Sequence, residues 1–101
     1  MNKDYMYFYK KVSSANISPT AKTVYRALLY YANRETWSCF PSIATLSKDT
    51  GLSKRTIIRQ IAVLEKEDLL LRIHRTREKN NGKTSNIYFL NWFFWGISMF
   101  N

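Results

Sequence analysis

The chain has 101 residues, of which 46% are hydrophobic and 16% aromatic, so it can bury one core and is not a disordered composition. Its 16 lysines and arginines against 7 aspartates and glutamates give a formal net charge of +9, which indicates an anionic partner. Nucleic acid fits this charge best, and a membrane surface is the second choice.

One cysteine and one histidine provide neither an internal disulfide nor a Cys/His metal site. The N-terminus lacks the apolar region of a signal peptide, and no stretch reaches the roughly 20 apolar residues of a membrane-spanning helix. We therefore expect a cytoplasmic protein with no metal, no cofactor and no membrane span.

Residues 5–12, YMYFYKKV, are rich in residues that favour strands. Every second residue from Tyr5 to Tyr9 is a tyrosine, which predicts a short N-terminal strand. The alternation leaves open which side of this strand is buried. Aromatic residues interleaved with basic ones also fit stacking on single-stranded nucleic acid.

A first helix is predicted over residues 18–34. Ser18 is a suitable N-cap, and Pro19 is tolerated in the first turn because its missing N–H would be unpaired there anyway. The opposite face carries Lys22 and Arg26, which we interpret as a solvated surface on a supporting helix. The apolar face consists of Ala21, Val24, Tyr25, Leu28, Tyr31 and Ala32.

Residues 42–67 predict two helices joined by a tight turn. Gly51 suits a left-handed turn, Leu52 returns to the core, and Ser53 caps the second helix. A capped helix with cations opposite its core stripe, entered through a glycine turn, fits the recognition helix of a helix-turn-helix. The stripe consists of Ile57, Ile61 and Leu64 with Ile58 at its shoulder, and the opposite face of Arg55, Arg59 and Lys66 flanked by Thr56 and Val63.

Residues 69–91 change to a period of two, which predicts the strands of a hairpin. The face of Leu69, Leu71 and Ile73 is expected on the core, and the Asn-Gly pair at 81–82 suits the turn. A basic hairpin after a recognition helix is typical of a wing, whose tip lies along phosphates or enters the minor groove. The cations near the tip are Arg75, Arg77, Lys79 and Lys83.

Residues 92–101, WFFWGISMFN, form an aromatic tail that would be costly to leave in water. Three roles remain open for it: packing against its own domain, forming a homodimer interface, or contacting a membrane interface.

Residues 18–90 resemble the winged helix-turn-helix domains of bacterial plasmid and phage replication-initiation proteins and related small regulators. The resemblance lies in SPTAKTVYRALLYYANRE, FPSIATLSKDTGLSKRTIIRQIAVLEKEDLL and GKTSNIYFL. It implies an α+β fold in which a three-helix core carries a C-terminal β-hairpin wing, here with the short N-terminal strand. It also implies double-stranded DNA as the partner.

By position, the resemblance also implies which residues meet DNA. Two positions depart from the common pattern, since Ser47 stands where alanine is frequent and Gln60 where an apolar residue is frequent. The implied base-facing residues are Lys54, Arg55, Thr56, Arg59 and Gln60, and the implied phosphate contacts are Ser42, Thr45 and Ser53.

The leading hypothesis is sequence-specific binding of double-stranded DNA by a small transcriptional regulator or replication-origin binder. The alternative is a protein–protein adaptor whose basic face meets an acidic partner. We expect no enzyme, because the sequence has no glycine-rich phosphate loop, no metal cluster and no recognisable nucleophile–base pair, hence no catalytic residues.

Overall fold

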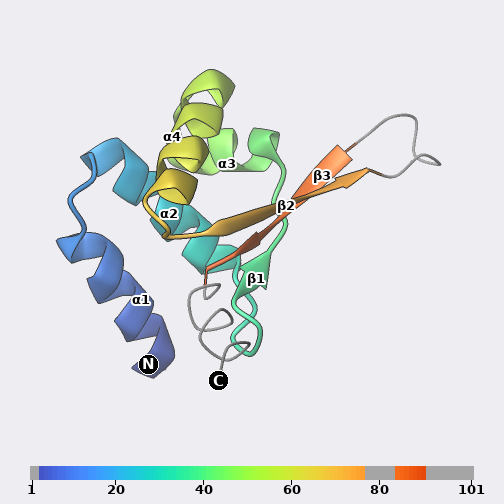
Figure 1. Ribbon diagram of the computed structural model, residues 1–101. Coiled ribbons are helices and arrows are strands. Elements are labelled where there is room, and N and C mark those ends of the chain that lie inside the picture. Colours follow the sequence, from blue (N-terminus) through green and yellow to red (C-terminus); the bar gives the residue numbers. More distant parts are fainter. Residues whose placement is uncertain (1–2, 77–83, 91–101) are drawn as a thin grey trace.

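The computed structural model describes residues 3–76 and 84–90, which form four helices and a small antiparallel sheet of three strands (Figure 1). This is an α+β fold, as predicted. In chain order the elements are α1 (Lys3–Ser14), α2 (Pro19–Tyr31), β1 (Ser38–Cys39), α3 (Ile43–Thr50), α4 (Lys54–Lys66), β2 (Leu71–Thr76) and β3 (Thr84–Phe89).

The N-terminal segment corrects the first prediction, because residues 5–12 lie within helix α1 and not in a strand. Phe8 and Val12, four residues apart, are both buried in the core, and this spacing belongs to one face of a helix. Tyr5 and Tyr9 are also four apart, and their rings stack at 6.5 Å between centroids. The alternating tyrosines therefore mark a helix, whose packing overrides their strand propensity.

Two cations of α2 hold the end of α1. Lys22 Nζ donates a hydrogen bond to the Ser13 carbonyl at 2.9 Å, and Arg26 Nη2 donates to Ser13 Oγ at 3.1 Å. The Arg26 guanidinium also lies 5.1 Å from the centre of the Tyr9 ring. The last carbonyls of a helix are unpaired and partly negative, so cations suit this place. The face of α2 that we interpreted as solvated thus binds α1.

Helix α2 packs against α1, α3 and α4, and its buried residues fall on a wider arc than predicted. Leu29 is fully buried, whereas Tyr31, which we placed on the apolar face, is partly exposed and donates a hydrogen bond to Asp49 of α3. The helix starts as expected, with the Ala21 N–H donating to Ser18 Oγ at 3.1 Å. It ends before residue 34, because Ala32 is already extended.

The sheet has the order β1-β3-β2, and strand β1 lies between the first predicted helix and the predicted helix pair. Ser38 pairs with Phe89, and Cys39 with Tyr88. Trp37, with a positive φ of 55°, is buried, and its carbonyl accepts the Leu90 N–H at 2.9 Å. The predicted strands of residues 69–91 correspond to β2 and β3, whose described ribbon projects away from the helices (Figure 1).

In the β2–β3 ribbon, two residues that we expected to face the core face solvent instead. Leu71 is 38% exposed and Ile73 is 44% exposed, so these residues do not face the core. Asp68, with a φ of 60°, ends the helical path, and Leu69 and Leu70 after it are both buried. This places Arg72 on the same side as the buried Tyr88, to which it is paired.

Cys39, the last residue of strand β1, is buried. Burial raises the pKa of its thiol to about 12, because the surroundings disfavour the charged thiolate. A thiol with this pKa is almost fully protonated at neutral pH and is a poor nucleophile. The residue therefore serves packing.

Candidate nucleic-acid interface

The turn between α3 and α4 is held by three side-chain and backbone contacts. Gly51 has a φ of 75°, and its N–H donates to the Ser47 carbonyl at 2.9 Å. The Ser47 hydroxyl donates to the Leu52 carbonyl at 2.6 Å, and the Leu52 N–H donates to Thr50 Oγ1 at 3.2 Å. Ser47 thus gives the Leu52 carbonyl a hydrogen-bond donor. Alanine, which is frequent at this position in helix-turn-helix units, could not donate this bond. The contacts fix α4 relative to α3.

Replacing Gly51 by alanine should lower the free energy of unfolding by about 1 kcal/mol, because a left-handed backbone brings Cβ close to a carbonyl oxygen. An added Cβ meets no atom within 4 Å, so the cost is conformational and not a clash. Urea titration measures the change. Gly51→Asn is the control and should cost less, since asparagine tolerates this conformation better. Equal or greater stability of Gly51→Ala would contradict the argument.

Both helices of the pair begin with the same Ser-x-x-Thr cap. Ser42 Oγ accepts the Thr45 N–H at 3.0 Å and donates to Thr45 Oγ1 at 2.9 Å. Ser53 Oγ accepts the Thr56 N–H at 3.1 Å and donates to Thr56 Oγ1 at 2.9 Å. Each serine hydroxyl hydrogen is therefore used within its cap. The threonine hydroxyls act as acceptors in these bonds, so their own hydrogens are not used within the caps.

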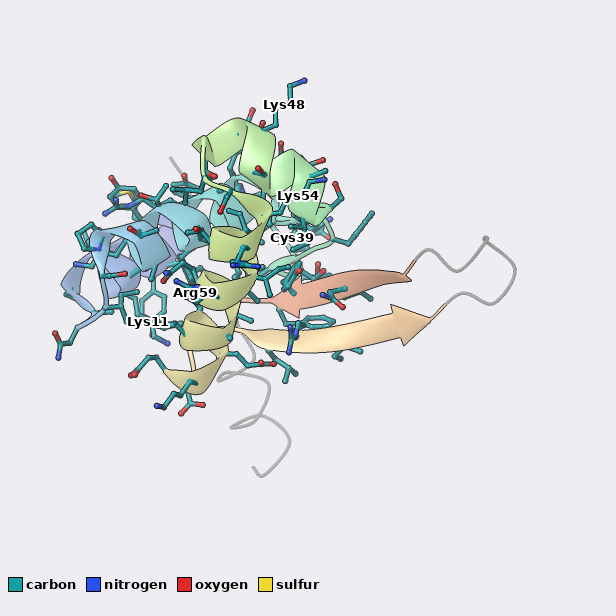
Figure 2. All side chains as sticks on the ribbon, turned by 90° about the horizontal axis from the view of Figure 1, so that it is seen from above. Lys11, Cys39, Lys48, Lys54 and Arg59 are labelled. Carbon is teal, nitrogen blue, oxygen red and sulfur yellow. The ribbon has the colours of Figure 1, made fainter. Side chains whose placement is uncertain are left out.

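The faces of α4 match the predicted periodicity. Ile57, Ile61 and Leu64 are buried, and the predicted cationic face of Arg55, Arg59 and Lys66 is exposed. Lys54 at the helix start is exposed as well, and Figure 2 shows Lys54 near the start of α4 and Arg59 farther along the helix. Within residues 3–76 and 84–90, none of these four cations forms an ion pair.

Two of the predicted base-facing residues are less accessible. Thr56 is half-buried and its hydroxyl accepts from Ser53, while Gln60 is half-buried on the flank of α4 near the core stripe. The structure therefore brings Lys54, Arg55 and Arg59 together as the accessible part of the predicted set.

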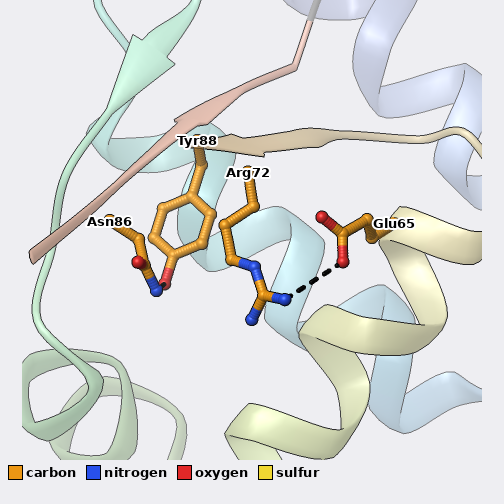
Figure 3. A network of polar contacts seen from close by, with 4 residues as sticks. All are labelled: Glu65, Arg72, Asn86 and Tyr88. Atoms are coloured by element: carbon orange, nitrogen blue, oxygen red, sulfur yellow. Dashed lines mark hydrogen bonds and ion pairs between the residues drawn. The ribbon is translucent and has the colours of Figure 1, made fainter. Parts of the chain in front are cut away.

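A polar network connects α4 to the sheet (Figure 3). Arg72 Nη2 lies 3.3 Å from Glu65 Oε1, and Asn86 Nδ2 donates to the Tyr88 hydroxyl at 3.3 Å. The sequence offered no signal for this ion pair, because the two residues lie on different elements. Since both side chains are about one-third exposed, with accessibilities of 37% and 34%, the pair orients Arg72 more than it stabilises the fold.

Part of the predicted site lies outside the described residues. Arg75 lies in β2, paired in register with Ser85, but its side chain is not among those described. The other tip cations also fall outside the described ranges; they are Arg77, Lys79 and Lys83. The same holds for the aromatic tail of residues 92–101, so its possible roles, including a homodimer interface, stay predictions.

A helix pair joined by a glycine turn, with a cationic outer face on its second helix, defines a domain of the kind that binds DNA. The family described as helix-turn-helix domain matches residues 15–70. This is more than half of the chain, so the protein belongs to that family, and its membership indicates DNA as a partner. No curated protein and no solved structure gives a significant match.

The described part of the chain has neither a membrane-spanning helix nor a metal-binding cluster. None of its helices combines the length and apolar character needed to cross a membrane. Residues 3–76 and 84–90 also bring together no group of three or more His, Cys, Asp or Glu side chains able to hold a metal ion.

Proposed function

We propose that this protein binds specific sequences of double-stranded DNA as a winged helix-turn-helix, acting as a small transcriptional regulator or a replication-origin binder. The observation that carries the proposal is the exposed cationic face of α4, directly opposite its buried stripe. Cations that form no ion pair with described residues are available to an external anion. The family membership supports DNA as that anion.

The position of the cations on α4 supports direct reading of bases. Recognition helices contact base edges with residues of their N-terminal part. Lys54, Arg55 and Arg59 lie in the first half of α4, whereas Lys66 is its last residue. In the major groove, arginine most often pairs with guanine through two hydrogen bonds. We therefore assign Arg55 and Arg59 to bases and Lys66 to phosphate.

Phosphate contacts would fix the domain on the duplex. Within the two caps, the hydroxyls of Ser42 and Ser53 donate their hydrogens to threonine. The hydroxyls of Thr45 and Thr56 only accept in these bonds, so they are suitable donors to phosphate. The wing would add contacts through the cations of its tip, Arg75, Arg77, Lys79 and Lys83. Such contacts give affinity without sequence information and make binding sensitive to salt.

The test is a selection from a pool of random duplexes, with the retained fraction sequenced and its affinity titrated with salt. We expect one enriched motif that contains guanine. Affinity for it should fall with salt at a log–log slope of about −0.9 for each phosphate contacted. Salt-sensitive binding without an enriched motif would contradict sequence specificity. Absence of binding at low salt would favour an adaptor with an acidic protein partner.

A further inference from the structure

Ile58 is the large apolar side chain on α4 that the structure leaves open to solvent. It is 53% exposed, and the sequence pattern placed it at the shoulder of the apolar stripe. It belongs neither to the buried core cluster nor to the partly buried residues that pack against that cluster. Core packing therefore does not explain an isoleucine at this position.

The neighbours of Ile58 place it beside the cations that we assign to bases. Arg55 lies one turn before it and Arg59 directly after it, all in the first half of α4. Ala62, one turn later, is also exposed. At about 100° per residue, Ile58 is displaced by about 60° from Arg55 around the helix, on the flank where Glu65 meets Arg72 of β2. A short apolar strip thus runs along the cationic face.

An apolar side chain in the major groove has one matching partner on the bases. Among the groups that the bases display there, the 5-methyl group of thymine is the largest apolar one, whereas most of the others are hydrogen-bond donors or acceptors. A single exposed isoleucine is ordinary on a protein surface. On a helix face that enters the major groove, however, an isoleucine would displace water from polar base edges without replacing its hydrogen bonds, which is unfavourable. Contact with the thymine methyl group avoids this cost.

We propose that Ile58 is a specificity-determining residue that packs against the 5-methyl group of a thymine in the bound site. The inference rests on the proposed function, because it requires α4 to lie in the major groove. It adds to that function the identity of one base pair, a T·A pair adjacent to the guanines read by Arg55 and Arg59.

The test removes the methyl group from the DNA and its partner from the protein. Each thymine of the enriched duplex is replaced in turn by deoxyuridine, which lacks only that methyl group. At one position we expect the wild-type protein to bind the uracil duplex about fourfold more weakly, the effect of one buried methyl-sized group. Ile58→Ala should bind the thymine and uracil duplexes equally, which closes a double-mutant cycle.

Ile73→Ala is the matched control, because it removes the same atoms from a side chain of β2 that is 44% exposed. It should keep the full discrimination of thymine against uracil. Circular dichroism and thermal melting establish that both variants are folded, and Ile58→Val should keep part of the discrimination.

Three results would count against the inference. Equal binding of thymine and uracil duplexes at every position would overturn it while the enriched motif upheld the proposed function. Uracil sensitivity that persists in Ile58→Ala would assign the methyl contact to another side chain. Failure to enrich any motif would overturn the proposed function and this inference with it.

Discussion

Replacing Arg55 and Arg59 together by alanine should abolish sequence-specific DNA binding and leave the fold intact. Both side chains are exposed on α4, so their removal takes no atom from the core. Each good bidentate arginine–guanine pair discriminates by about 1–3 kcal/mol. The double variant should therefore lose at least about 2 kcal/mol, which corresponds to roughly 30-fold in affinity for the selected duplex.

A charge-preserving control separates base reading from simple attraction. Replacing both arginines by lysine keeps the positive charges but removes the planar fork that binds a guanine edge. We expect this variant to bind all duplexes at low salt with little preference among them. Fluorescence anisotropy on the selected and a scrambled duplex measures both quantities. If the alanine variant kept its preference for the selected duplex, α4 would not be the reading element.

The helix pair was the part of the fold most open to prediction, because its signals are local. Gly51 marks the left-handed turn, Ser53 marks the start of α4, and the three-to-four residue spacing of Ile57, Ile61 and Leu64 defines the buried face. Each signal acts within one or two helical turns. The tertiary packing of the described structure is consistent with all of these local signals.

Segments whose burial depends on distant partners were predicted less well. The tyrosines of α1 alternate as they would in a strand, but contacts with α2 and with the loop after α2 favour a helix. In that loop, the centroid of the Trp37 ring lies 4.8 Å from the centroid of the Phe8 ring. Strand β1 has two residues and gains its hydrogen bonds from β3, about fifty positions later in the chain. Neither relation is visible in a local pattern.

The candidate site divides in the same way. Exposure of Arg55 and Arg59 followed from periodicity, whereas the half-buried state of Gln60 depends on how α4 sits against its neighbours. The open position of Ile58 could not be predicted, because an apolar residue at the edge of a stripe is normally covered by an adjacent element. The structure leaves Ile58 uncovered, at 53% exposure.

Replacing Phe8 by alanine should lower the free energy of unfolding by about 3–5 kcal/mol, the range for deleting a buried phenylalanine side chain. Phe8 is 3% exposed and packs against Trp37. The domain family matches from residue 15 onward, so α1 precedes the matched region. A large cost would make α1 part of the cooperative unit, since small domains have only about 5–15 kcal/mol of stability in total.

The neighbouring Tyr7 provides the control for this prediction. It is 45% exposed on the same helix, so Tyr7→Ala should cost about 1 kcal/mol or less, as is usual for a substitution at the surface. Urea unfolding of both variants, followed by circular dichroism and tryptophan fluorescence, measures the two free energies. Equal and small costs would mean that α1 opens independently of the core. If the transitions seen by circular dichroism and by fluorescence coincide, and only Phe8→Ala shifts them strongly, then Phe8 couples α1 to the core and the two unfold together.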